Sequence, residues 1–309
     1  MHKLRRFFYQ NKYQIFKVLG IIAFIIIIIQ FMNFLVRKNG NNKISNTVSN
    51  TTEVRENNKG VISTKSAVTG SEISKKDLDE ATTAINNFVD YCNKQDFEKA
   101  YDLITDECKK KLFKNVNEFK TTYYKNLFNG EKKNCTIENW VRNTYRVNFT
   151  GDILATGKDD GSVQQDYITV KEVDDGYKLN INNYIGYSDI NKKTTQNGIT
   201  IEVVGKNTYM DYEEYTLKVT NKTESIMQLD DVSSTDTLYI EDKNGVKYTY
   251  YNHELANSVV TILSGQIKEV NIKFYSSYVS TKSIKRMVFS DIMLRNGQSG
   301  EIMKMVVEI

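Results

Sequence analysis

The chain has 309 residues, with 42 basic and 38 acidic side chains and a formal net charge of +4. Seven basic residues and no acidic residue fall in the first 38 positions, which leaves 35 basic against 38 acidic side chains in the rest. The part of the chain after residue 38 is therefore mildly acidic and lacks the basic face that nucleic acid requires, so nucleic acid is excluded as the expected partner. The absence of proline indicates the compositional bias of an AT-rich bacterial genome.

The first predicted element is an apolar segment at residues 18–36. As a helix it would extend about 28 Å, close to the roughly 30 Å hydrocarbon core of a bilayer. Lysine and arginine are retained on the cytoplasmic side, so residues 1–17 are expected inside and the rest of the chain outside. The predicted topology determinants are Lys3, Arg5, Arg6, Lys12 and Lys17. The sequence thus predicts a single-pass cell-membrane protein with an uncleaved signal anchor, whose first partner is the lipid bilayer around residues 18–36.

Two alternatives for this segment are less favoured. A cleaved signal peptide would have a shorter apolar region followed by a small-x-small site, which residues 30–42 do not offer. A buried core helix would need apolar neighbours on every side of the five isoleucines at 25–29. Residues 37–73 are polar and without apolar periodicity, which predicts a flexible linker.

Helices are predicted next. Ser74 and Asp77 have the spacing of a capping box, which marks a helix start. Apolar side chains then recur at helical spacing. They are Leu78, Ala81, Ile85, Phe88, Val89 and Cys92. Asp96 can cap a second helix, and a third apolar series runs over 112–127.

Strands are predicted after these helices. Residues 136–142, 145–149, 163–172 and 177–181 alternate or are rich in β-forming side chains, with turns at 157–161 and 174–176. Short turns between sequential strands favour antiparallel pairing. The predicted fold class for 74–190 is therefore α+β, with helices on a curved antiparallel sheet.

This order resembles the nuclear-transport-factor-like superfamily, also called the ketosteroid-isomerase-like cone. The resemblance rests on FVDYCNKQDFEKAYDLI at 88–104 and on the strands that follow to about residue 185. It implies a pocket between helices and sheet. The candidate lining residues are Asp90, Tyr91, Tyr124 and Trp140. Aromatic side chains at these spacings are also typical of a core, and the superfamily's histidine is missing, which argues against catalysis there.

After a polar junction at 191–197, residues 198–309 predict an all-β sandwich of about eight short strands. The stretch ITIEVVGKNTYMDYEEYTLKVTNKTESIMQL at 199–229 resembles the immunoglobulin-like modules of uncharacterised membrane-anchored bacterial proteins. An antibody-type disulfide is excluded there, because the last cysteine is Cys135.

The sequence contains few residues able to do chemistry. His2 and His253 are the two histidines, and GxSxG, Walker, GxGxxG and HExxH patterns are absent. Fragments of calcium loops at 159–161 and 242–245 lack the twelve-residue ligand spacing. Cys92, Cys108 and Cys135 match no metal-ligand spacing and favour buried thiols, although a Cys92–Cys108 disulfide stays open. We therefore predict no enzyme activity, no catalytic residue, no cofactor and no metal.

The function predicted from the sequence is that of a membrane-anchored extracytoplasmic binding or scaffold protein of the bacterial cell envelope. Its partner would be another envelope protein or a polymer. Two alternatives are a component of a conjugation or secretion apparatus and a small-ligand pocket protein acting through the cone-like domain. All three rest on fold-level analogy.

Overall fold

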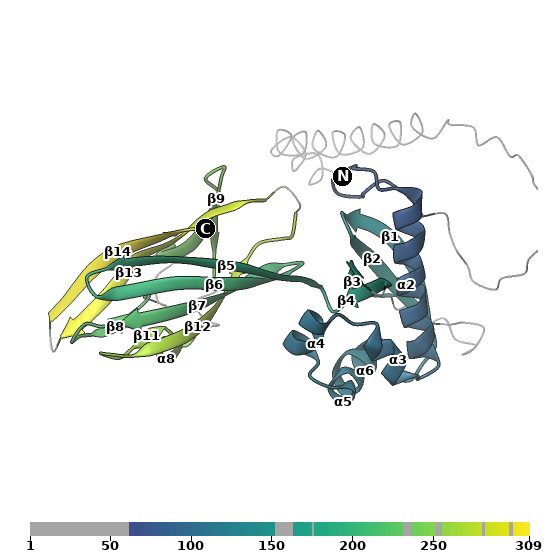
Figure 1. The fold of residues 1–309 in the computed structure, drawn as a ribbon, viewed down its shortest axis with the longest axis horizontal. Coiled ribbons are helices and arrows are strands. Elements are labelled where there is room, and N and C mark those ends of the chain that lie inside the picture. Colours follow the sequence, from purple (N-terminus) through teal and green to yellow (C-terminus); the bar gives the residue numbers. More distant parts are fainter. Residues whose placement is uncertain are drawn as a thin grey trace, which may run out of the picture. The chain divides into compact units, whose positions relative to one another are not determined.

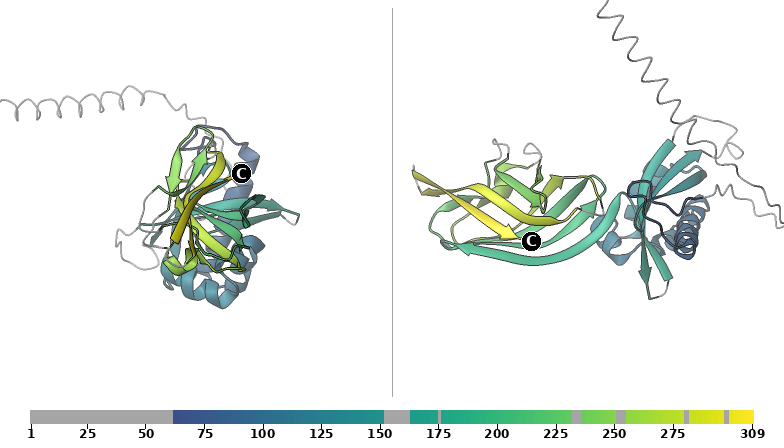
Figure 2. Two further views of the ribbon diagram at one scale, coloured as in Figure 1. Left: turned by 90° about the vertical axis from the view of Figure 1, so that its left-hand side faces the viewer. Right: turned by 90° about the horizontal axis from the view of Figure 1, so that it is seen from above.

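A computed structural model describes residues 62–151, 163–174, 176–231, 236–250, 255–279, 282–296 and 299–309. These residues belong to one compact unit, 58–309. Within it lie two hydrophobic cores, one built from residues between 78 and 209 and the other from residues between 199 and 307. Figures 1 and 2 show the ribbon.

Except for α8, the described helices precede the first sheet in the chain, and they lie beside that sheet (Figure 1). Ser74 caps α2 (Lys75–Asn93) by accepting the Asp77 N–H at 3.0 Å, and Asp96 caps α3 (Phe97–Asp102) by accepting the Lys99 N–H, so both predicted caps are confirmed. Shorter pieces follow. They are α4 (Asp106–Leu112), α5 (Val116–Phe119), the π-helix η1 (Lys120–Tyr124) and α6 (Lys125–Leu127), with α8 (Asn257–Val260) much later in the chain.

The first sheet is antiparallel with order β1-β2-β3-β4, as the short turns predicted. Its strands are β1 (Lys133–Val141), β2 (Thr144–Gly151), β3 (Val163–Val173) and β4 (Gly176–Asn180). Tyr145, Val147 and Phe149 alternate with polar residues along β2, and all three are buried in the first core together with the apolar side chains of α2.

Two further sheets enclose the second core. One has the order β12-β7-β6-β5, and the other has the order β10-β9-β13-β8-β11 with β14 paired to β13. Ile199, Ile201 and Val203 on β6 are fully buried, which confirms the predicted alternation. The strands are β5 (Tyr184–Gln196), β6 (Ile199–Tyr209), β7 (Tyr212–Asn221), β8 (Ile226–Gln228), β9 (Leu238–Asp242), β10 (Lys247–Thr249), β11 (Thr261–Ile262), β12 (Ile267–Tyr275), β13 (Ile284–Asn296) and β14 (Ser299–Glu308).

Strand β5 joins the two cores without an intervening loop. Its first residue, Tyr184, is fully buried in the first core, and from Tyr184 to Gln196 the strand pairs with β6 of the second sheet system. The Tyr184 hydroxyl donates to Asn207 Oδ1 at 3.0 Å, and its ring lies 5.2 Å from the Tyr209 ring. A hydrogen bond and a ring contact therefore join the start of β5 to the end of β6.

The predicted fold class was wrong. Strands make up most of the described chain, and apart from α8 its helices are confined to residues 75–127. Only α2 exceeds seven residues, so these helices do not form the layer of a cone-like α+β domain. The physical reason is that the third predicted helical series, 112–127, does not form one continuous helix. Asn115 caps a new helix there, and the Thr121 and Thr122 hydroxyls bond to carbonyls of the preceding turn within the π-helical region.

The single-pass, signal-anchor description of the chain is also corrected. Across the ranges that the structure describes, no helix is both long enough and apolar enough to cross a bilayer. The predicted span at 18–36, its five basic topology determinants and the turn at 157–161 lie outside the described residues. Residues 62–73 were assigned to the predicted linker. In the structure this segment contacts β1, where the Ala67 N–H donates to the Asn139 carbonyl at 2.8 Å.

Candidate functional site

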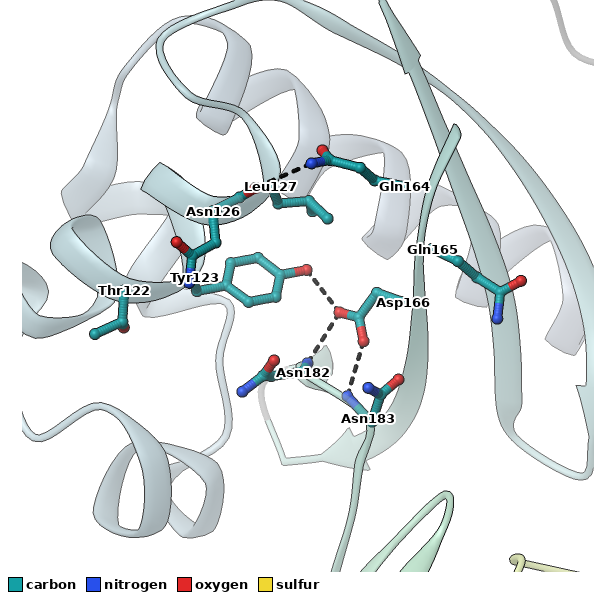
Figure 3. A pocket seen from close by; sticks show the side chains of 9 residues that line it. All are labelled: Thr122, Tyr123, Asn126, Leu127, Gln164, Gln165, Asp166, Asn182 and Asn183. Atoms are coloured by element: carbon teal, nitrogen blue, oxygen red, sulfur yellow. Dashed lines mark hydrogen bonds between the residues drawn. The ribbon is translucent and has the colours of Figure 1, made fainter. Parts of the chain in front are cut away.

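A pocket of about 310 Å³ opens beside the first sheet (Figure 3). It lies where η1 and α6 approach β3 and the turn between β4 and β5. Except for Leu127, the lining side chains are polar. The lining residues are Thr122, Tyr123, Asn126, Leu127, Gln164, Gln165, Asp166, Asn182 and Asn183.

Asp166 is the one charged residue of this lining, and it is fully engaged. Its Oδ2 accepts the Tyr123 hydroxyl at 2.7 Å and the Asn182 N–H at 2.9 Å. Its Oδ1 accepts the Asn183 N–H at 2.8 Å. Figure 3 shows all three donors pointing at the carboxylate. Asp166 therefore ties together a helix, a strand and a turn.

The two asparagines explain why the chain turns at this point. Asn182 and Asn183 have φ angles of 62° and 60°, the left-handed conformation that asparagine tolerates better than most residues. Two such residues in succession form a tight reversal and direct both N–H groups to one side. The Asn183 side chain completes the arrangement by accepting the Tyr167 N–H at 3.2 Å.

Tyr123 reaches the pocket from the π-helix. A π-helical turn rotates side chains out of α-helical register, and such turns are frequent at functional sites. The Tyr123 ring stacks on Phe119 at 5.8 Å and meets Phe113 edge-on at 5.9 Å. The aromatic packing fixes the ring, so the hydroxyl has a defined position.

Burial dominates the electrostatics of this pair. Burial raises the pKa of Asp166, although the hydrogen bonds from Tyr123, Asn182 and Asn183 act in the opposite direction. Burial, with the neighbouring Asp166 charge, raises the pKa of Tyr123 well above its ordinary value. The tyrosine therefore stays protonated at neutral pH and acts as a donor to Asp166.

The lining combines one hydrogen-bonded carboxylate with uncharged polar side chains. Each Asp166 oxygen accepts at least one hydrogen bond from within the protein. The other polar groups of the lining are carboxamides and one hydroxyl, which donate and accept hydrogen bonds without charge. Within the described ranges, no group of three or more histidine, cysteine, aspartate or glutamate residues could hold a metal ion.

The four residues predicted to line a pocket are not among the residues that line this one. Asp90 and Tyr91 are half-buried on α2, and Lys99 Nζ lies 5.7 Å from the Tyr91 ring. Tyr124 packs edge-on against Phe97 at 4.7 Å in the first core. On β1, Trp140 lies 5.4 Å from the Tyr167 ring and 4.6 Å from the guanidinium of Arg146.

The sequence prediction missed Tyr123 and Asp166 for different reasons. Tyr123 lies next to the predicted Tyr124, and only the π-helical geometry decides which of the two tyrosines lines the pocket. Asp166 stands in an ordinary strand pattern with no local signal. The pair Asn182–Asn183 was the available sign, because consecutive asparagines after a strand predict a tight turn that a nearby carboxylate can cap.

The comparisons with known proteins leave the family open. No family model matches the chain, and no curated protein matches it. A solved structure of a conserved hypothetical protein from Bacillus anthracis has 12% sequence identity, covers 38% of this chain and 94% of that chain, and gives a TM-score of 0.25. A TM-score this low carries no argument about fold or function, so the two family resemblances stay predictions.

Proposed function

We propose that this protein is a non-catalytic binding or scaffold protein, and that the pocket at Tyr123 and Asp166 receives a neutral, hydrogen-bonding group of its partner. The observation that carries the proposal is the engagement of both Asp166 oxygens by Tyr123 and by two backbone N–H groups. The only carboxylate of the pocket stabilises its wall, and the side chains of Thr122, Asn126 and Asn182 supply uncharged donors and acceptors.

The ligand chemistry follows from this lining. Carboxamides and hydroxyls match hydroxyl and amide groups, which are abundant in sugar polymers and in peptide backbones. A volume of about 310 Å³ holds a single residue of such a polymer rather than a long segment. A small-ligand pocket protein and a polymer-binding scaffold would therefore use the same side chains, and ligand length distinguishes them.

The test titrates the full chain with soluble oligomers of N-acetylglucosamine. Intrinsic fluorescence and melting temperature are the two readouts of binding. Ligand that binds only the folded state raises the melting temperature. The variant Asn126→Ala removes an exposed pocket amide and should weaken binding. Asn117→Ala removes an exposed amide on α5, outside the pocket, and serves as the matched control.

Stronger binding of the longer oligomers would support a polymer partner, and equal binding of the monosaccharide would support a small ligand. Equal behaviour of Asn126→Ala, Asn117→Ala and wild type would show that the pocket is not the binding site. Turnover of the oligomers into shorter products would contradict the non-catalytic assignment.

A further inference from the structure

A second pocket, of about 260 Å³, has five charged side chains in its lining. It combines the β1–β2 turn, β3, the start of β5, the end of β6, the start of β7 and the segment before β13. The lining residues are Arg142, Lys171, Ile185, Gly186, Tyr187, Ser188, Lys206, Thr208, Glu213, Tyr278, Val279 and Lys282. Four of these side chains are cationic, and one is a carboxylate.

The most buried part of this pocket holds two lysines on one carboxylate. Lys206 Nζ lies 2.7 Å and Lys282 Nζ 3.5 Å from Glu213 Oε1. The Tyr215 hydroxyl donates to the other oxygen at 3.0 Å. The side chains of Lys282 and Glu213 are only 5% and 3% exposed. Lys282 also donates to Ser276 Oγ at 2.5 Å, and the Asp242 charge favours its protonated form. Among the residues that line the pocket, cationic side chains still outnumber carboxylates, which favours an anion there.

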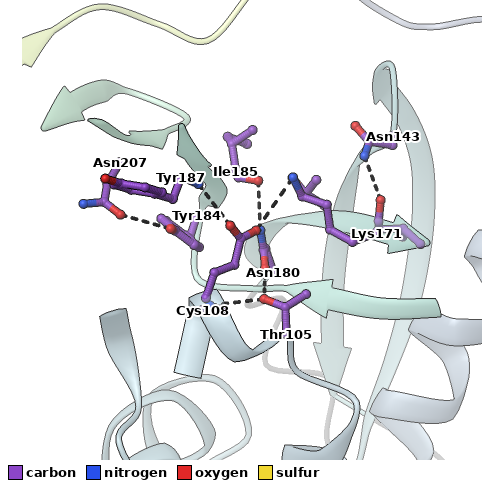
Figure 4. A network of polar contacts seen from close by, with 12 residues as sticks. Thr105, Cys108, Asn143, Lys171, Asn180, Tyr184, Ile185, Tyr187 and Asn207 are labelled. Carbon is purple, nitrogen blue, oxygen red and sulfur yellow. Dashed lines mark hydrogen bonds and ion pairs between the residues drawn. The ribbon is translucent and has the colours of Figure 1, made fainter. Parts of the chain in front are cut away.

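Two lining residues, Lys171 and Tyr187, contact Glu107. Figure 4 shows Lys171, Tyr187 and Asn180 in the network of polar contacts there. Glu107 Oε1 accepts Asn180 Nδ2 at 2.7 Å, and Oε2 accepts the Tyr187 N–H at 3.2 Å. Lys171 Nζ lies 3.7 Å from Glu107 Oε1. Glu107 therefore pairs with Lys171 and also holds a side chain and the start of β5, which fixes this side of the pocket.

Gly186 allows this close packing. Its φ is 152°, and an added Cβ would lie 3.0 Å from Lys171 Nζ and 3.2 Å from Glu107 Oε1. Any larger residue would push the lysine away from the strand. Lys171 and the buried pair Lys206 and Lys282 therefore line the same small volume.

We propose that this pocket binds a small tetrahedral oxyanion, the group shared by free phosphate and phosphate monoesters. Lysines bind phosphate as point charges, and charge-assisted hydrogen bonds are among the strongest that proteins make. The volume is below that of pockets for drug-sized ligands and suits a compact anion. The proposal does not depend on the amide-lined pocket at Tyr123 and Asp166.

The titration behaviour of the lysine pair is consistent with this site. Burial lowers the pKa of Lys282 and Lys206 acts in the same direction, whereas Glu213 and Asp242 raise it. A bound anion would add a second opposite charge and favour protonated Lys282.

The experiment measures the melting temperature and the binding isotherm of the full chain with inorganic phosphate, against sodium chloride of equal ionic strength. Glycerol 3-phosphate in a parallel titration distinguishes a monoester from free phosphate. Lys282→Met leaves a neutral Lys206–Glu213 pair, so this variant should fold and bind phosphate roughly ten- to hundredfold more weakly. Lys218→Met changes an exposed lysine on β7 and is the matched control.

A second variant acts in the opposite direction. Glu213→Gln leaves both lysines without their carboxylate, so phosphate should raise its melting temperature more than that of wild type. Circular dichroism of each variant verifies folding. Phosphate that fails to exceed chloride with wild type would overturn the proposal. Equal phosphate effects on Lys282→Met and Lys218→Met would overturn it as well, because binding would then be non-specific.

Discussion

The Tyr123 hydroxyl lies 2.7 Å from Asp166 Oδ2, so one hydrogen bond joins the π-helix to β3 across 43 residues of chain. The same carboxylate accepts two N–H groups of the β4–β5 turn. Asp166 therefore connects three segments that local sequence does not bring together.

Tyr123→Phe should destabilise the protein by about 1.5–3 kcal/mol, because it leaves a buried carboxylate with one donor fewer. Urea unfolding of both proteins measures the difference. Tyr101→Phe is the matched control. It removes a hydrogen bond of equal length, 2.7 Å, to the uncharged carbonyl of Phe113 and should cost only about 0.5–1.5 kcal/mol. A Tyr123→Phe effect no larger than that of Tyr101→Phe would show that Asp166 gains nothing special from the tyrosine.

The pH dependence of stability should report the raised pKa of Asp166. A carboxyl whose pKa in the folded protein exceeds the unfolded value binds more protons when folded. Its contribution is therefore fully present below the ordinary value of 3.8 and is lost as pH rises through the higher folded pKa.

Asp166→Asn removes this titration. The unfolding free energy of wild type minus that of Asp166→Asn should therefore decrease from about pH 3 toward about pH 6. Urea unfolding at several pH values measures it. A difference that increases over the same range would mean that the hydrogen bonds to Asp166 outweigh its burial.

Gly186→Ala should destabilise the protein by about 1–3 kcal/mol, because the residue has a φ of 152° and the new methyl group would approach Lys171 and Glu107. Gly300→Ala is the control, since a Cβ there meets Leu294 O at 3.8 Å, an ordinary contact distance. Thermal unfolding compares them. Similar melting temperatures for the two variants would show that Lys171 and Glu107 can move without penalty.

The three cysteines should react slowly in the folded protein. All are free thiols, so the disulfide left open between Cys92 and Cys108 does not form in this structure. Burial raises the pKa of Cys108 to about 12 and that of Cys135 to about 11, and it raises the pKa of Cys92 still further. Since the thiolate is the reactive form, iodoacetamide at neutral pH should modify Cys135 first.

Mass spectrometry of the folded and the urea-unfolded protein measures the modification at each cysteine. The unfolded chain should gain three adducts quickly. Rapid modification of Cys108 in the folded state would contradict its burial, and failure of the unfolded chain to take up three adducts would indicate a disulfide.

Local sequence was sufficient wherever the structure depends on neighbouring residues. The caps at Ser74 and Asp96, the alternation of Ile199, Ile201 and Val203, and the antiparallel order of the first four strands were all predicted correctly. Capping involves residues three apart, and alternation follows from the pleat of a strand, so both can be read along the chain.

The tertiary structure alone decided the fold class and both pockets. The π-helical turn brings Tyr123 rather than Tyr124 to Asp166, and the pairing of β6 with β7 and the segment before β13 bring Lys206 and Lys282 to Glu213. Both arrangements depend on packing between distant segments. A carboxylate or a lysine has the same local pattern whether it is solvated or buried against a partner. Only the folded chain determines its partners, because burial and pairing are properties of the whole arrangement.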